Sequence, residues 1–440
     1  MSFLIVILSL VILIVLISLF KVNAFIAFII SSIFAGIALG IPLDKLPTSI
    51  NNGVGNILGS LTIIIVLGAM LGKLVAESGA AQKIAEVMVS LFGTKHIQWG
   101  LMVTGFVVGI PLFYGIGFVL LVPLIFSIVY KYKLPAVYIG LPMLAALSVT
   151  HGFLPPHPSP VALVGLFNAN IGMTLIYGLC LAIPAIIIAG PLFGSTLKNV
   201  KTGPTTMFEP KEVTNEFGQP GAANSLLSAT LPVFLLIIST VIPYLFPSMG
   251  AKAKSIVALV GSPSFVMLIA LLYATYTLGI RQKRPLKKIM DVYAEAIKDI
   301  AMILLIIAGS GIFKQIMEDS GVSAQLASAL EQLPIHPLIL GWLIAAVIRV
   351  CIGSATVAGL TAASVILPLM AQTHVNPNLM VLAVGAGSLM FSHVNDSGFW
   401  MFKEYFNLSL KDTFRTWSVM ETIVSVVGII GVMTLHFIIE

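Results

Sequence analysis

The side chains with the clearest capacity for chemistry are polar groups that interrupt long apolar runs. The run over 378–400 contains the segment Ser392-His393-Val394-Asn395-Asp396-Ser397-Gly398. Polar groups inside a membrane segment are costly unless they face water, a ligand or one another. Burial of a carboxylate favours its protonated form, so Asp396 is predicted to carry a proton, the alternative being a static ion pair or helix cap. Asn395 and Ser397 are predicted to bind hydroxyl groups.

A second interruption lies in the run over 136–167, which contains His151-Gly-Phe-Leu-Pro155-Pro156-His157-Pro158-Ser159-Pro160. Four prolines in six residues remove backbone donors and clash with preceding carbonyls, so the helix is expected to unwind here. The alternative is a kink in a continuous helix, but a kink needs only one proline. His151, His157 and His393, the last in the first interruption, are predicted to bind substrate hydroxyls or relay protons. The alternative is that each is a buried, hydrogen-bonded histidine.

Two further apolar stretches, 98–130 and 337–372, are each broken near the middle by small and polar residues. In the second, a helix is expected to begin near Ala355, where free N–H groups favour an anion. Ser354 and Thr356 add hydroxyls. Arg349, one turn earlier, has a planar fork that fits a carboxylate, unless it pairs with Asp396 or a helix end.

The tip of the first of these stretches offers Tyr114 and open backbone as binding groups, although both tips would also serve as tight packing turns. No acid or cysteine is spaced with the histidines as metal ligands would be, so neither a metal nor a cofactor is predicted. Cys180 and Cys351 both lie in apolar runs, where a disulfide is not expected.

The elements that must position these groups are membrane helices. Of 440 residues, 58% are hydrophobic and only 9% charged, and the mean hydropathy is +1.07. This composition excludes a soluble enzyme, a nucleic-acid binder and a disordered chain, and it predicts an all-α polytopic membrane protein. Ten runs are long enough to cross a bilayer, namely 3–20, 24–41, 57–76, 136–167, 172–194, 226–247, 255–280, 297–317, 378–400 and 416–438.

The interrupted stretches 98–130 and 337–372 are each either two spans or a re-entrant helical hairpin. If both are hairpins, seventeen basic residues fall on one side of the membrane and four on the other. Positive charge marks the cytoplasmic side, so this reading places both termini outside. The polar segment 195–224 is predicted to be a cytoplasmic linker.

The two halves of the chain resemble each other at a nearly constant offset. Gly68–Lys73 matches Gly309–Lys314, and Leu147–Phe153 matches Leu389–Asn395. We expect a first repeat over 1–194 and a second over 225–440, each with five spans, one hairpin and one broken span. An odd number of spans inverts the second repeat, and inverted repeats with paired broken helices are typical of secondary transporters. A duplicated structural bundle without transport is the alternative.

At three motifs the chain resembles the gluconate permease family, the gluconate:proton symporters of the larger ion-transporter superfamily. The motifs are His151-Gly-Phe-Leu-Pro-Pro-His-Pro, Phe391-Ser-His-Val-Asn-Asp-Ser-Gly-Phe-Trp400 and Gly353-Ser-Ala-Thr-Val-Ala-Gly359. The resemblance implies proton-coupled uptake of gluconate or a related small hydroxy-carboxylate across the bacterial inner membrane. It also implies a homodimer with an elevator-type mobile part. D-serine or another sugar acid remains an alternative substrate.

The chain is therefore expected to be a secondary active symporter and not an enzyme. Its expected partners are a small carboxylate, protons, the lipid bilayer and a second copy, with no nucleic acid. The alternatives from other classes are an intramembrane enzyme and a passive anion channel. No set of nucleophile, base and acid supports the enzyme, and a channel would not concentrate its solute.

Overall fold

The computed structural model describes residues 2–112, 114–200, 202, 219–246, 248–322, 334–370, 373, 375–394 and 396–439. Every regular element in these residues is a helix. The elements are α1 (Ser2–Ser18), α2 (Ala24–Ala38), α3 (Leu46–Glu77), α4 (Ala80–Phe92), α5 (Ile97–Gly109), α6 (Tyr114–Tyr132), α7 (Ala136–Phe153), α8 (Pro158–Phe167), α9 (Ile171–Ile187), η1 (Ile188–Leu192), α10 (Phe193–Ser195), α11 (Ala222–Leu245), α12 (Ala251–Val260), α13 (Pro263–Ala274), η2 (Thr275–Gly279), η3 (Ile280–Gln282), α14 (Leu286–Asp319), α16 (Pro337–Ile352), α17 (Ala355–Met370), α18 (Pro377–Gly387), α19 (Ser397–Tyr405), α20 (Leu410–Thr413), η4 (Phe414–Ser418) and α21 (Val419–Ile439).

Seven helical segments of the described chain are long and apolar enough to cross a membrane, against ten predicted spans. The three predicted spans without such a segment are the two N-terminal runs and the run over 378–400, which is divided into the short helices α18 and α19. Helices α1 and α2 have 17 and 15 residues, or roughly 25 and 23 Å at 1.5 Å per residue, whereas a bilayer core is about 30 Å thick. The all-helical, polytopic class is confirmed.

The predicted span over 255–280 is also different in the structure. It is divided into α12, which ends at Val260, and α13, which begins at Pro263. Proline is favoured in the first turn of a helix and disfavoured in its interior, so the chain breaks before it. Most of the predicted linker over 195–224 lies outside the described residues.

The predicted helix interruptions are present. Helix α7 ends at Phe153 and α8 begins at Pro158, so Pro155 and Pro156 lie between two helices, while Pro158 and Pro160 lie in the first turn of α8, where proline is tolerated. Helices α18 and α19 are separated by 388–396. The two interrupted stretches are helix pairs, α5 with α6 and α16 with α17, and α17 begins at Ala355 as expected.

The long helices α3 and α14 pack against each other through glycines. A Cβ atom on Gly53 would lie 2.7 Å from the carbonyl oxygen of Gly311, and one on Gly311 would lie 2.5 Å from the oxygen of Gly53. Small residues let membrane helices approach at backbone distance, where van der Waals contact is greatest. The two helices therefore form a closely packed central pair.

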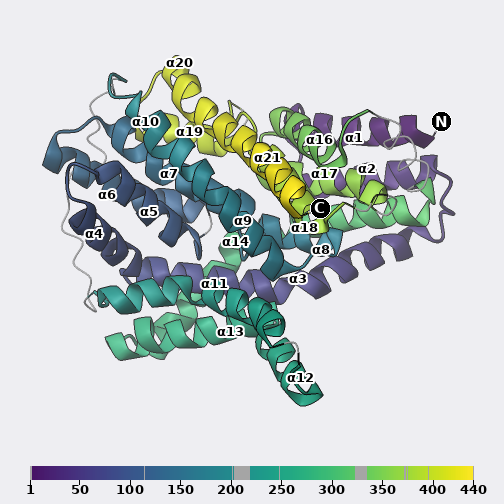
Figure 1. Ribbon diagram of the computed structural model, residues 1–440. Coiled ribbons are helices and arrows are strands. Elements are labelled where there is room, and N and C mark those ends of the chain that lie inside the picture. Colours follow the sequence, from purple (N-terminus) through teal and green to yellow (C-terminus); the bar gives the residue numbers. More distant parts are fainter. Residues whose placement is uncertain are drawn as a thin grey trace.

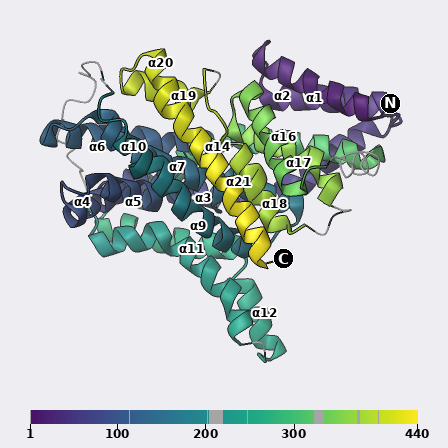
Figure 2. The same cartoon turned by 45° about the horizontal axis from the view of Figure 1, so that its top comes forward.

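The remaining helices are arranged around this pair. Figure 1 and Figure 2 show α4, α5 and α6 toward one end of the molecule and α16 and α17 toward the other, with α21 crossing between them. Helices α1 and α2 lie beside α16 and α17, while α12 projects away from the body in both views. This arrangement brings the two helix pairs and the two broken helices to a common centre.

Candidate functional site

A central cavity of about 250 Å³ lies where the four interruptions meet. Its walls come from the start of α6, the last turns of α7, the middle of α14, the junction of α16 with α17, the segment before α19, and the start of α21. Ligand pockets are typically ~300–1,000 Å³, so a cavity of this size suits a small ligand.

Three helices begin at this cavity. Tyr114 opens α6, Ala355 opens α17 and Ser397 opens α19. The Ser354 hydroxyl accepts a hydrogen bond from the backbone N–H of Val357 at 3.4 Å. Helix N-termini carry partial positive charge and free N–H groups, so their convergence provides a favourable environment for an anion.

Arg349 and Asp396 form an ion pair on the cavity wall. The Arg349 side chain is 4% exposed and that of Asp396 is 16% exposed. Asp396 also accepts hydrogen bonds from the hydroxyl of Ser392 and, at 2.9 Å, from the backbone N–H of Gly398, which caps α19. Asp396 therefore accepts hydrogen bonds from three donors, which is the ion pair and helix cap considered above as the alternative to a proton carrier.

Several buried polar atoms of the cavity residues have no hydrogen-bond partner within the described part of the chain. They are Nε and Nη1 of Arg349, the hydroxyl of Tyr114 and Nδ1 of His151. Unsatisfied buried polar groups cost about 1–3 kcal/mol each, so such a group is expected to have a partner in the working protein. Two guanidinium nitrogens, one hydroxyl and one ring nitrogen match the oxygen atoms of a hydroxylated acid.

The cavity brings together seven of the ten predicted site residues, namely Tyr114, His151, Arg349, Ser354, Thr356, Asp396 and Ser397. The other three lie elsewhere or are not described. Nε2 of His157 lies 2.6 Å from the carbonyl oxygen of Gly109, and its ring packs against that of His151 behind the wall.

His393 is the second predicted residue that does not line the cavity, since its Nε2 lies 2.9 Å from the carbonyl oxygen of Val350. His393 and His151 occupy equivalent positions in the two sequence repeats, but their surroundings in the structure differ. Asn395 lies outside the described residues. No group of three His, Cys, Asp or Glu side chains in the described chain is placed to hold a metal ion.

Glu421 on α21 lines the cavity and was not predicted from the sequence. It is 3% exposed, and the hydroxyl of Ser148 lies 2.7 and 2.9 Å from its two carboxylate oxygens. The available signal was an acidic residue inside the apolar run over 416–438, the same signal that singled out Asp396. Trp417, which donates a hydrogen bond to Ser392 at 2.8 Å, is a further unpredicted wall residue.

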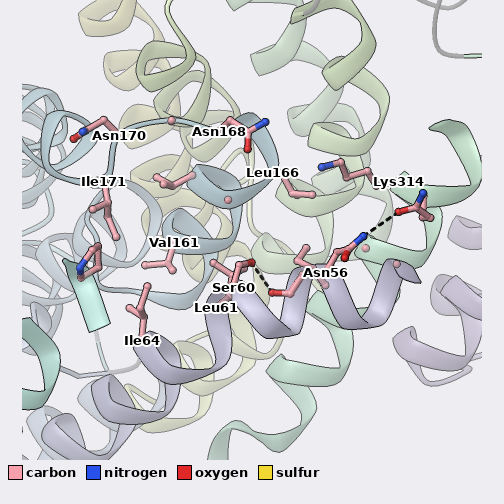
Figure 3. Close-up of a pocket in the computed structure, with 18 of the residues that line it drawn as sticks. Asn56, Ser60, Leu61, Ile64, Val161, Leu166, Asn168, Asn170, Ile171 and Lys314 are labelled. Atoms are coloured by element: carbon pink, nitrogen blue, oxygen red, sulfur yellow. Dashed lines mark hydrogen bonds between the residues drawn. The ribbon is translucent and has the colours of Figure 1, made fainter. Parts of the chain in front are cut away.

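A second, larger cavity of about 630 Å³ lies beside α3, about two turns further along α14. Figure 3 shows Asn56 and Ser60 from α3, Lys314 from α14, and Asn168 and Asn170 from the turn between α8 and α9 around it. Its polar groups are mostly neutral, and it contains none of the helix interruptions. The central cavity is therefore the better candidate for the functional site.

Comparison with known proteins identifies the family of the chain. The model of the GntP family permeases matches residues 1–438. This chain belongs to the GntP permease family. The high-affinity gluconate transporter of Escherichia coli (strain K12) is 46% identical over 421 residues, covering 96% of both chains. The Gnt-II system L-idonate transporter of the same organism is 45% identical, covering 95% of both. The gluconate permease of Bacillus subtilis (strain 168) is 44% identical, covering 95% of this chain and 96% of its own.

The fold has a more distant match among solved structures. The YdaH transporter of Alcanivorax borkumensis has a TM-score of 0.68 at 17% identity, covering 94% of this chain and 98% of its own. At that identity the match supports the fold alone. As a GntP permease, the protein is a membrane transporter and not an enzyme, which confirms the expected class.

Proposed function

We propose that this GntP permease is a secondary active symporter that couples the uptake of gluconate, or a related small hydroxy-carboxylate, to the inward movement of protons. The central cavity carries this proposal, because it combines three helix N-termini with unpartnered guanidinium, hydroxyl and imidazole groups. The similarity to gluconate and L-idonate transporters over almost the whole chain supports a sugar acid as the substrate.

The residues of the cavity suggest how the substrate is held. Its carboxylate binds the free Nε and Nη1 of Arg349 and the N-terminus of α17, where Ser354 and Thr356 add hydroxyls. Its hydroxyl groups bind His151 and Tyr114. A single strong cationic group beside many neutral ones favours a polyhydroxylated monocarboxylate over a dicarboxylate, which would need more positive charge.

Proton coupling requires a group in or near the cavity that binds and releases a proton during the cycle. The cavity holds two carboxyl side chains, Asp396 and Glu421. The concentration gradient of protons then drives accumulation of the sugar acid, which a passive channel does not achieve.

The transport cycle in this proposal is of the elevator type, with two inverted repeats over 1–194 and 225–440. The glycine-packed pair of α3 and α14 belongs to the fixed part. The two helix pairs and the two broken helices move together as the substrate-carrying part. In this topology both termini face outward from the bacterial inner membrane, the protein is a homodimer, and the cavity of Figure 3 forms an outer vestibule.

Reconstitution in proteoliposomes tests the proposal. Labelled gluconate should accumulate above its outside concentration when the outside is acidic, and an uncoupler should abolish the accumulation. A panel of competitors containing L-idonate, other sugar acids, D-serine and simple hydroxy acids ranks the substrates. Accumulation that survives an uncoupler and requires sodium would refute proton coupling, and failure of every sugar acid to compete would refute the substrate class.

A further inference from the structure

We propose that Glu421, positioned by Ser148, carries the coupled proton, while Asp396 remains an ionised anchor for Arg349. This inference rests on the proposed function and names the proton-carrying residue of that site. It reverses the expectation from the sequence, in which Asp396 was the proton carrier. The two carboxyl groups have different surroundings.

The surroundings of Glu421 suit a group that changes charge. Its side chain is 3% exposed, and it forms no ion pair with the described residues. A carboxylate buried without a cation pays a large desolvation cost, which protonation removes. The hydroxyl of Ser148, within 2.9 Å of both oxygens, can donate to the ionised form and accept from the protonated form. One partner therefore serves both charge states.

The surroundings of Asp396 suit a group that stays charged. Arg349 supplies a paired cation, while Ser392 and the backbone N–H of Gly398 supply two further donors. A protonated Asp396 could accept hydrogen bonds from only some of these three donors, and its protonation would leave the guanidinium of Arg349 buried without a counter-charge. Asp396 therefore orients Arg349 for the substrate and does not exchange a proton.

The titratable groups that share the cavity with Glu421 come from four other elements. They are Arg349 on α16, Asp396 before α19, His151 on α7 and Tyr114 at the start of α6. Helices α9 and α18, which also pack against α21, contain no charged residue. Arg349 is already compensated by Asp396, so the charge of Glu421 sets the net charge that an arriving anion meets.

This geometry links proton binding to substrate binding. With a monocarboxylate bound, the net charge of the cavity is minus two if Glu421 is ionised and minus one if it is protonated. A sphere of 250 Å³ would be about 8 Å across, and we take about 8 Å as the order of the distance between the Glu421 carboxyl group and the bound carboxylate. At an effective dielectric constant of ~20, the repulsion between two charges about 8 Å apart weakens binding roughly thirtyfold. By linkage, the substrate favours proton uptake to the same extent.

The proton step is balanced without any further reactant. The Glu421 carboxylate takes a proton from water on the outer side as the substrate anion binds. The carboxyl group returns that proton to water on the inner side when the anion leaves, so the protein is unchanged after each cycle. Substrate and proton thus load and unload together.

Transport measurements in proteoliposomes with a pH-sensitive dye inside test the assignment. In Glu421→Gln, exchange of labelled gluconate across the membrane should persist, while acidification of the lumen during uptake is lost. Glu421→Asp should restore acidification. Glu404→Gln, which removes an exposed carboxylate paired with Lys403, should behave as the wild type. Continued acidification at the wild-type ratio of protons to gluconate in Glu421→Gln would overturn the inference.

A binding measurement covers the case in which Glu421→Gln does not transport. By calorimetry in detergent, the affinity of the wild type for gluconate should fall with rising pH, up to roughly thirtyfold, and that of Glu421→Gln should not depend on pH. If the affinity of Glu421→Gln for gluconate depended on pH as that of the wild type does, the inference would be overturned. It would also be overturned if Asp396→Asn transported gluconate without acidifying the lumen. A wild-type protein that carries gluconate without protons would instead refute the proposed coupling itself.

Discussion

Removing the Arg349 side chain should destabilise the protein strongly, and a second substitution should reverse most of that loss. The Arg349→Met variant keeps a long apolar side chain but leaves Asp396 without its cation, in a place where the carboxylate is 16% exposed. Breaking a buried ion pair by removing one partner typically costs about 3–5 kcal/mol. Because Asp396 retains some solvent and two other donors, we expect a loss of about 3 kcal/mol in the free energy of unfolding.

The double variant, Arg349→Met with Asp396→Asn, removes the uncompensated charge and keeps an amide oxygen for the N–H of Gly398. We expect it to lie within about 1 kcal/mol of the wild type, so that the second substitution recovers about 2 of the roughly 3 kcal/mol lost in Arg349→Met. Reversible unfolding by SDS in mixed micelles, followed by tryptophan fluorescence, measures all four members of the cycle. Additive losses, or a loss below about 1 kcal/mol in Arg349→Met alone, would refute the reasoning. Neither variant should bind gluconate.

Two further predictions address the packing and the ligand. A Cβ atom on Gly72 would lie 2.1 Å from the carbonyl oxygen of Pro111 at the α5–α6 tip, so Gly72→Ala should cost about 1–3 kcal/mol of stability. Gly59→Ala, on the same helix, adds a Cβ atom with no neighbour within 4 Å and should be neutral or stabilising. Thermal unfolding of both variants measures the difference, and equal melting temperatures would contradict this packing. His151→Ala should raise the Kd for gluconate about fivefold, because one hydrogen bond to the substrate is lost. His393→Ala, away from the cavity wall, should leave that Kd unchanged in calorimetry, and a matching loss there would contradict the assignment.

The helix interruptions were predictable because their causes are local. Pro155 and Pro156 cannot continue α7, whatever surrounds them, and Pro158 and Pro160 are accommodated only in the first turn of a new helix. The beginning of α17 at Ala355 follows from Gly353 and Ser354, where a left-handed glycine at φ 84° and a capping serine separate two helices. The membrane class followed from composition, since too few polar residues are present to cover a soluble surface.

The contacts of the site were less predictable, because they depend on residues far apart in the sequence. Arg349 pairs with Asp396 across 47 positions, and sequence reasoning left this pairing open beside a direct role in substrate binding. Glu421 meets Ser148 across 273 positions. The repeat pattern suggested equivalent roles for His151 and His393, but only the former reaches the cavity.

For this protein the sequence alone determined that the chain is a bundle of membrane helices, and where four of its apolar runs must break. Hydropathy and backbone sterics act over a few residues and need no knowledge of the rest of the fold. Only the tertiary structure decided which carboxyl group is paired with a cation and which is buried without one. That difference arises from how α16, α7 and α21 pack around a common cavity, and burial and pairing together determine whether an acid keeps its charge.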